Sequence, residues 1–284
     1  MNKNLELGNR MKNYYEQVSK TKLMRKCSVA IRIDGCHFRT FTKNLNKPFD
    51  DIVIKTMQST MKYLCANIQG CILGYTQSDE ITLILTDYKN IDSDAWFDYE
   101  VEKLCSVSAS MATLAFNQFF KENVTLYKLK VSLYKFKAYD GISKYKDDIT
   151  EKYIKNLDKA IENGAIFDAR CFNVPKEEVT NLLYWRQKDA IRNSIQMVGQ
   201  ANFSQEELNH KSLEDIKHML CDKNIVWDVF PKAKRFGSCC IKKETVIENN
   251  NPNEHDIYKR NKWVIDDDIP LFKDENRNYI EKLL

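Results

Sequence analysis

Hydrophobic and polar side chains alternate along residues 29–34, and this pattern predicts a β-strand. Successive side chains of a strand point to opposite faces, so Arg32 and Asp34 share one face while aliphatic side chains occupy the other. A hairpin is predicted within residues 71–86, because two apolar runs there flank a polar break that contains Asp79. The first strand therefore ends at Asp34, and the first arm of the hairpin leads into Asp79.

Three further segments place hydrophobic residues at helical spacing, and one more alternates like a strand. The predicted helices are residues 51–67, 92–119 and 175–199, and the predicted strand is residues 165–174. Asp50 suits the N-cap of the first helix, and Asp92 with Ser93 suits that of the second. The order β-α-β-β-α-β is typical of the ferredoxin-like fold, in which right-handed crossovers place both helices on one face of an antiparallel sheet.

We therefore expect an α+β protein with two parts. Residues 1–200 would form the ferredoxin-like domain, with a helical insertion near residues 121–164 whose shape the pattern leaves open. Residues 201–284 would form a smaller C-terminal α/β extension, since short helices and then strands are predicted there. A chain of 284 residues is long enough to give such parts a core.

The composition is that of an ordinary soluble globular protein, with 43% hydrophobic and 30% charged residues. No apolar run reaches the roughly 18 residues that a membrane helix needs. The first residues lack the apolar stretch of a secretion signal. The nine cysteines form no CxxC pair, which favours reduced thiols over a zinc site or a disulfide framework. We therefore expect a cytoplasmic protein without a membrane partner.

The net charge is only +4, but cationic side chains gather in two places. We call residues 20–26 the N-terminal basic segment and residues 232–243 the C-terminal basic segment. Clusters of this kind suit a polyanionic partner, and they favour a bulky RNA over a lone nucleotide.

The acidic residues at the strand ends are candidates for metal binding. The predicted strand order brings Asp34 next to the hairpin tip, which carries Asp79 and Glu80. Two carboxylates and a backbone carbonyl suffice for Mg²⁺, which prefers hard oxygen ligands and retains others for water and phosphate. Either aspartate alone more often caps a turn, so the pairing carries this prediction. Arg32 on the same face needs an acidic partner or a phosphate, because an isolated charge there is costly.

Several other candidates are weak when taken singly. Backbone N–H groups of residues 35–38 suit a phosphate if the chain turns into a helix after the first strand. His37 and Arg39 could contact phosphate or base. Lys47 could do the same, although an isolated loop lysine is more often solvated surface.

A later helix carries a polar stripe. Arg186, Asp189 and Asn193 are spaced at i, i+3 and i+7, so they lie on one side of that helix. Such a stripe suits contact with phosphate or RNA, and it equally suits a protein interface. Asp168 and Arg170 share one face of their strand, either as an exposed ion pair or as part of a site.

Together these motifs resemble those of the tRNA-histidine guanylyltransferase family, and within it the bacterial-type guanylyltransferase-like 3′-5′ polymerases. The resemblance covers most of the first 200 residues in the right order, and it is looser beyond them. The matching residues are Arg32-Ile-Asp-Gly35, Phe38, Lys47-Pro48, Asp50, Gly74-Tyr75, Gln77-Ser-Asp-Glu80, Phe167-Asp-Ala-Arg170, Trp185-Arg-Gln-Lys-Asp189 and, more loosely, Arg235-Phe-Gly237 and Trp263-Val-Ile-Asp266.

The resemblance implies a palm-type catalytic domain, as in polymerases, and a nucleotidyltransferase that extends the 5′ end of tRNA against the opposite strand as template. ATP or GTP would activate the 5′-monophosphate of the tRNA. The 3′-hydroxyl of an incoming nucleoside triphosphate would then attack the activated end. Two Mg²⁺ ions per active site and a homotetramer are implied as well.

The resemblance also implies roles for individual residues. The catalytic residues would be Asp34, Asp79 and Glu80, and the Mg²⁺ ligands would be Asp34, Gly35 and Asp79. Nucleotide contacts are implied for Arg32, Cys36, His37, Phe38, Arg39, Lys47, Asp50, Ser78 and Asn193. Contacts with tRNA are suggested for Arg170, Arg186, Arg192, Lys234 and Arg235.

One motif departs from the family pattern. Members dedicated to tRNA-His carry His-Ile-Asn-Asn after the Trp-Arg-Gln segment, whereas this chain has Ile191-Arg-Asn-Ser194. The missing histidine favours repair of 5′-truncated tRNAs in general over strict guanylate addition to tRNA-His. A palm-fold nucleotide cyclase and a non-catalytic RNA-binding protein are the alternatives from other classes, and the complete acidic set argues against the latter.

Overall fold

An antiparallel sheet forms the centre of the protein in this computed structural model, which describes residues 3–139, 147–248 and 257–284. Its strand order is β4-β1-β3-β2-β5-β6. The strands are β1 (Ser28–Cys36), β2 (Cys71–Gln77), β3 (Glu80–Leu85), β4 (Ile166–Val174), β5 (Ser238–Glu248) and β6 (Ile257–Asp266). The first four strands and the two long helices between them confirm the predicted α+β, ferredoxin-like arrangement.

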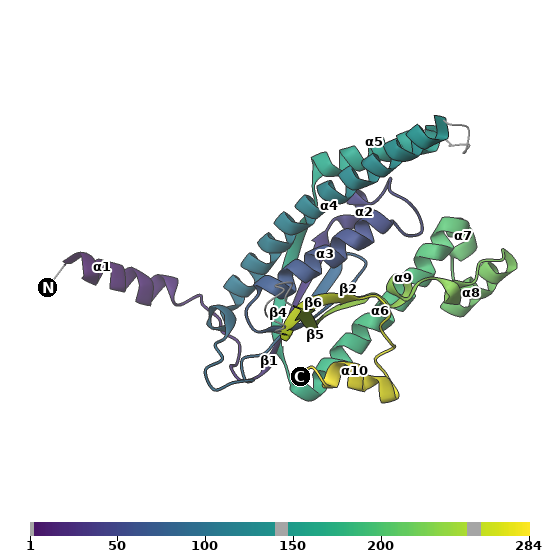
Figure 1. The fold of residues 1–284 in the computed structure, drawn as a ribbon. Helices are drawn as coiled ribbons and strands as arrows, with labels where there is room; N and C mark the ends of the chain where they lie inside the picture. Colours follow the sequence, from purple (N-terminus) through teal and green to yellow (C-terminus); the bar gives the residue numbers. More distant parts are fainter. Residues whose placement is uncertain (1–2, 140–146, 249–256) are drawn as a thin grey trace.

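Two helices cover one face of the sheet, as the crossover rule predicts (Figure 1). They are α3 (Asp51–Asn67) and α4 (Val101–Tyr139). Their apolar stripes meet the aliphatic side chains of β1 and β3 in the largest core cluster, which includes Ile31, Leu83 and Phe116. Alternation in β1 therefore sends Arg32 and Asp34 to the opposite face.

The second helix differs from its predicted bounds at both ends. It begins at Val101, after a short 3₁₀ helix (Trp96–Tyr99), so Asp92 and Ser93 lie in a turn and do not cap it. It also continues well beyond residue 119, because Phe120, Val124 and Val131 extend its buried stripe at helical spacing.

The predicted insertion is the outer half of α4 together with α5 (Asp147–Asn163), and residues 140–146 of it lie outside the described part of the chain. The stripe of α5 supplies Tyr153, Leu157 and Ala160 to the same core. The outer half of α4 is not evident in the sequence, because basic residues along 127–139 weaken its apolar period.

The other face of the sheet is covered by α6 (Val179–Asn202) and by the C-terminal residues, including α10 (Asn278–Glu281). Leu183 and Phe272 pack there against Ala30 and Leu73 of the sheet. A smaller core joins the distal end of α6 to the helices that follow it. Those helices are α7 (Gln205–Leu208), α8 (Leu213–Asp222) and α9 (Lys232–Phe236).

The C-terminal strands join the same sheet as the first four. β5 pairs with β2, and β6 extends the edge beyond it. A boundary at residue 200 therefore divides the chain by sequence position, while its sheet is continuous across that point. The two-part division stays a prediction.

The N-terminal helix α1 (Lys3–Met11), followed by a π-helix (Lys12–Glu16), extends away from the rest of the protein (Figure 1). The remaining short elements are α2 (Phe38–Phe41) and the 3₁₀ helices Lys176–Glu178, Trp227–Val229 and Asp274–Arg277. Within the described ranges, no helix is both long and apolar enough to span a bilayer.

Candidate active site

The acidic residues predicted at the strand ends lie side by side. Asp34 on β1 stands directly opposite Glu80 on β3. The backbone N–H of Gly35 donates a hydrogen bond to the carbonyl of Asp79, at 3.1 Å. Ser78 and Asp79 form the two-residue turn between β2 and β3, and Ser78 has a positive φ of 50°. The hairpin turn thus presents Asp79 at the end of β1.

Gly35 permits this close approach. A Cβ atom at position 35 would lie 2.4 Å from the ring of Phe38 and 3.1 Å from the Cβ of Asp79. The ring has little room to move, because Phe38 is buried among Phe41, Phe116 and Phe167. A larger residue at position 35 would therefore separate the two strand ends.

The environment of the two aspartates disfavours their negative charges. Burial raises the pKa of Asp34, the nearby Asp168 raises it further, and Arg170 and Arg32 oppose that shift. Burial also raises the pKa of Asp79, against a hydrogen bond from Ser78, and the charge of Asp34 adds to the shift. A cation placed between the carboxylates would relieve this cost.

The donor set fits Mg²⁺. Two carboxylates and the Gly35 carbonyl are hard oxygen ligands, and this number leaves coordination positions for phosphate and water. No group of three or more His, Cys, Asp or Glu side chains arranged for a metal occurs among the residues that the structure describes. A metal at this place would therefore need backbone, water or substrate oxygens to complete its coordination.

A cavity of about 410 Å³ opens beside Asp79. Its walls come from the segment after β1, the start of α3, the β2–β3 turn, the distal half of α6 and α9. Eight of the predicted site residues line it: Phe38, Arg39, Lys47, Asp50, Ser78, Asp79, Asn193 and Lys234. These walls belong to four separate stretches of the chain, residues 38–54, 77–79, 190–200 and 233–237. A volume of this size is typical of a small-molecule site.

Asp50 shapes this cavity through its hydrogen bonds. One oxygen caps α3 by accepting from the N–H groups of Ile52 and Val53, at 3.0 and 3.1 Å. The other oxygen accepts from the N–H of Asn46 and from the hydroxyl of Tyr153, at 3.1 and 2.6 Å. The predicted N-cap is therefore confirmed. The sequence does not predict the contact of Tyr153 with Asp50, because Tyr153 is visible there only as a member of the apolar stripe of α5.

Glu80 belongs to a buried network beneath the two aspartates. Arg186 Nη1 donates to Glu80 Oε2 at 2.8 Å, and Arg186 also pairs with Asp189 at 3.4 Å. The Arg186 guanidinium stacks on Trp185, with its centre 3.7 Å from the ring centroid. Burial raises the pKa of Glu80, while the charge of Arg186 opposes the shift. Arg186 is only 7% exposed, and this burial argues against its predicted contact with tRNA.

The remaining predicted residues lie in different settings. Cys36 and His37 do not line the cavity; the Cys36 thiol donates to Asp168 at 3.5 Å, and His37 is exposed at the start of α2. Arg170 and Arg192 are exposed, as an RNA contact requires. Arg235 is held inside the protein by a hydrogen bond to the Phe230 carbonyl at 2.8 Å, which argues against its contact with tRNA.

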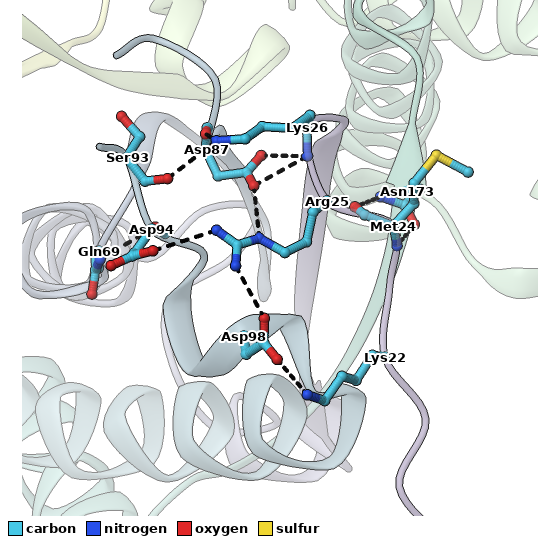
Figure 2. Close-up of polar contacts among 10 residues, drawn as sticks. All are labelled: Lys22, Met24, Arg25, Lys26, Gln69, Asp87, Ser93, Asp94, Asp98 and Asn173. Atoms are coloured by element: carbon cyan, nitrogen blue, oxygen red, sulfur yellow. Dashed lines mark hydrogen bonds and ion pairs between the residues drawn. The ribbon is translucent and has the colours of Figure 1, made fainter. Parts of the chain in front are cut away.

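The N-terminal basic segment is paired with acidic groups of the loop between β3 and α4. Figure 2 shows Arg25 among three aspartates, Asp87, Asp94 and Asp98, at 3.3 to 3.4 Å. Lys22 also pairs with Asp98. The hydrogen bonds of this segment therefore hold the chain against its own loop, and they weaken the inference of an RNA partner there.

The C-terminal basic segment is similar. Ion pairs join Lys232 to Asp268, Lys234 to Asp51, Arg235 to Asp228 and Lys243 to Asp266. Neither basic segment is a run of unpaired cations in the folded protein.

The chain is similar to known proteins over most of its length. A model of the family described as "Thg1: tRNAHis guanylyltransferase" matches residues 8–175. A bacterial tRNA(His) guanylyltransferase (Thg1)-like protein, solved in complex with ATP, has 34% identity and a TM-score of 0.76, and the match covers 98% of both chains. The same description in complex with GTP gives 32% identity and a TM-score of 0.72, again over 98% of both chains.

Two more distant proteins are also similar. The tRNA(His) guanylyltransferase of Saccharomyces cerevisiae has 19% identity and a TM-score of 0.57, over 80% of this chain and 91% of its own, which shows a shared fold. An uncharacterized protein of Acanthamoeba polyphaga mimivirus is 29% identical over 267 residues, which are 88% of this chain and 81% of the viral protein.

Proposed function

This chain belongs to the tRNA-histidine guanylyltransferase family, whose members are nucleotidyltransferases acting on the 5′ end of tRNA, and we propose that it extends 5′-truncated tRNAs by template-dependent 3′-5′ nucleotide addition. The observation that carries the proposal is the adjacency of Asp34 and Asp79, because Asp79 also lines a cavity of about 410 Å³. Solved relatives of similar fold carry ATP or GTP. ATP, GTP and other nucleoside triphosphates are therefore the proposed occupants of that cavity.

Asp34, Asp79 and the Gly35 carbonyl would hold the two Mg²⁺ ions of the proposed mechanism. When bound, these ions would neutralise phosphate charge and lower the pKa of an attacking hydroxyl. Glu80 lies opposite Asp34 and would add negative charge beside these ligands, because Arg186 fixes its carboxylate. Gly35 and the buried Phe38 keep the strand ends close enough for both aspartates to serve one site.

The proposed reaction has two displacements. In the first, a 5′-phosphate oxygen of the tRNA attacks the α-phosphorus of ATP, a new phosphoanhydride forms, and pyrophosphate leaves. In the second, the 3′-hydroxyl of the incoming nucleotide attacks the 5′-phosphorus, loses its proton, and expels AMP. The tRNA is then longer by one nucleotide that carries its own 5′-triphosphate.

The cavity residues suit the binding of a triphosphate in these steps. Lys47 and Arg39 supply positive charge to its wall, and the Ser78 hydroxyl lies at the turn beside Asp79. Asn193 reaches the same cavity from α6 and offers an amide for a sugar or base. The contacts proposed for Cys36 and His37 would run through the backbone of residues 35–38, since neither side chain lines the cavity.

Ile191 supports a broad range of tRNA substrates. This position, where the family motif has histidine, packs against the small core below α6 together with Ile195 and Val198. The side chain thus serves packing, while the neighbouring Asn193 lines the cavity. We propose that repair of several truncated tRNAs, rather than guanylate addition to tRNA-His alone, is the activity of this enzyme.

The test is an assay for extension of the tRNA 5′ end. Purified protein is incubated with Mg²⁺, ATP, all four nucleoside triphosphates and a 5′-monophosphorylated tRNA that lacks its first nucleotide. We expect restoration of full length, and its loss in Asp34→Ala and Asp79→Ala. Formation of a cyclic nucleotide without RNA extension would instead identify a palm-fold cyclase.

Two further measurements complete this test. Truncated tRNA-His is compared with other truncated tRNAs, and extension of tRNA-His alone would contradict the proposed substrate range. A homotetramer is proposed from the family resemblance, and light scattering on the purified protein would measure its mass in solution.

A further inference from the structure

Two arginines stand directly opposite each other on the face of the sheet that carries Asp34. In the antiparallel pairing of β1 with β4, Arg32 is opposite Arg170, and Asp34 is opposite Asp168. Like charges in directly opposed positions of neighbouring strands destabilise a sheet. We call Arg32 and Arg170 the arginine pair. Their placement is costly unless an anion lies between or above them.

Arg32 is poorly satisfied by the protein itself. Its Nε is buried and has no hydrogen-bond partner. Arg32 forms a long ion pair with Glu80, whose Oε2 lies 3.9 Å from Arg32 Nε but only 2.8 Å from Arg186 Nη1. Glu80 is therefore engaged by Arg186, and Arg32 retains capacity to bind an anion.

Arg170 is the accessible member of the pair. Its side chain is 51% exposed, and its ion pair with Asp168 is long, at 3.4 Å, and equally exposed. An exposed pair of this kind is weak and exchanges readily with another anion. The arginine pair thus combines one buried guanidinium with one that reaches solvent.

A tryptophan completes this surface. Trp185 on α6 is 48% exposed. The guanidinium carbon of Arg32 lies 5.7 Å from the centroid of its ring. The Arg186 guanidinium covers part of the ring, at 3.7 Å from its centroid. The exposed part next to Arg32 suits a nucleotide, because the ring stacks a base while a guanidinium binds its phosphate.

This surface lies apart from the nucleotide cavity. Arg32, Arg170 and Trp185 do not line the cavity, whereas Asp79 does. Arg32 precedes Asp34 by two residues on the same face of β1. Asp79 therefore lines the cavity, while Asp34 next to it shares its face of β1 with Arg32 of the arginine-bearing surface.

The following inference rests on the proposed function, in which a nucleoside triphosphate and an RNA meet at these carboxylates. We infer that the arginine pair binds the 5′-terminal phosphate of the RNA and that Trp185 stacks on its terminal base. A phosphate next to a base could also come from a free nucleoside triphosphate. The openness of the surface favours the RNA, since a polymer needs a path to solvent and a triphosphate already has the cavity.

The experiment measures binding without ATP, so it does not depend on catalysis. Fluorescence anisotropy compares one RNA hairpin with a 5′-phosphate or a 5′-hydroxyl. We expect the wild-type protein to prefer the phosphate by about tenfold, as one charged hydrogen-bond pair would give. Arg170→Gln should reduce this preference to less than about threefold.

Arg277→Gln is the matched control. It removes one guanidinium from a surface ion pair, with Glu281 at 3.0 Å, on a different part of the protein. The preference for 5′-phosphate should survive in this variant. Retention of the full preference in Arg170→Gln would overturn the inference, and so would weaker ATP binding in place of weaker phosphate-RNA binding.

Trp185 provides a second readout. The other three tryptophans are buried or half-buried, so quenching of tryptophan fluorescence by RNA should come mainly from Trp185. We expect Trp185→Phe to keep RNA affinity within about twofold while it removes the quenching, because a phenyl ring still stacks on a base. Unchanged quenching in this variant would show that the base lies elsewhere.

The two proposals fail separately. If RNA extension occurs but Arg170→Gln leaves the phosphate preference intact, the phosphate site is wrong and the enzyme activity stands. If no extension occurs but the preference depends on Arg170, the activity is wrong and the phosphate site stands.

Discussion

The N-terminal basic segment and the arginine pair are both cationic, yet the fold treats them differently. Arg25 has three carboxylates within 3.4 Å, and they come from a loop more than 60 positions away in the chain. Arg32 has one carboxylate at 3.9 Å, and that carboxylate is already bound by Arg186. The denser cluster in the sequence is thus the better neutralised one in the structure.

This difference separates structural from ligand-binding cations. The pKa of Arg25 is raised by its hydrogen bond to Asp87, and the neighbouring acids strengthen the effect. Asp87 is fully buried and also accepts from the backbone N–H of Lys26, at 2.9 Å (Figure 2). These contacts fasten the segment beside the start of β1. The arginine pair has only a long contact with Glu80 and an exposed ion pair with Asp168, so an external anion can compete for it.

The largest expected effect concerns the two aspartates of the candidate active site. Asp34→Asn and Asp79→Asn should each lower the rate of nucleotide addition at least about a thousandfold, because electrostatic stabilisation at the reacting phosphate is lost. The free energy of unfolding without Mg²⁺ should stay equal or rise. Burial raises the pKa of both carboxyls, so their charged forms destabilise the fold and a neutral amide removes that cost.

Single-turnover rates and urea denaturation measure the two quantities on the same preparations. Loss of stability in parallel with loss of rate would mean that these aspartates are structural, and the contrast with the N-terminal basic segment would disappear.

The next effect concerns Arg186, the buried partner of Glu80. Arg186→Leu should lower the free energy of unfolding by about 3 kcal/mol, because it leaves the buried Glu80 without its close partner. Arg186→Lys retains a charge and should be less harmful. The control is Arg192→Leu, which removes an exposed arginine of the same helix. If both leucine variants are equally stable, Arg186 does not position Glu80.

On the opposite side of the comparison, Asp87→Ala should lower the free energy of unfolding by about 2 kcal/mol, since a buried acceptor of one backbone N–H and of Arg25 disappears. The rate of nucleotide addition at low temperature should be retained in the folded fraction. Urea titration followed by activity assays measures this. A rate loss without a stability loss would place the basic segment in the site.

The sequence predicts the part of the molecule in which local pattern and tertiary fold agree. Alternation in residues 29–34 correctly separates Arg32 and Asp34 from the core, and Asp50 is recognisable as an N-cap. The hairpin turn at Asp79 is also correct, because its two residues interrupt otherwise apolar strands. These features depend on neighbours close in the chain.

Features that depend on distant partners could not be predicted in this way. The sequence gives no sign that Asp87 and Asp98 neutralise the basic residues before β1, since the pairing requires the fold. The burial of Arg186 depends on distant partners in the same way. The sequence predicts only that Arg186 shares one side of its helix with Asp189 and Asn193. The Tyr153 contact with Asp50 spans 103 positions and has no local signal.

The smallest expected effect tests the comparison most directly. Arg25→Gln should change the dissociation constant for 5′-phosphorylated RNA by less than about twofold, because a guanidinium held by three carboxylates contributes little to a polyanion site. Arg170→Gln removes the same charge from the arginine pair and should reduce the affinity clearly more. Titration at two salt concentrations measures both variants together. A steeper loss for Arg25→Gln would reverse the assignment, since the paired cations would then be the ones that meet the RNA.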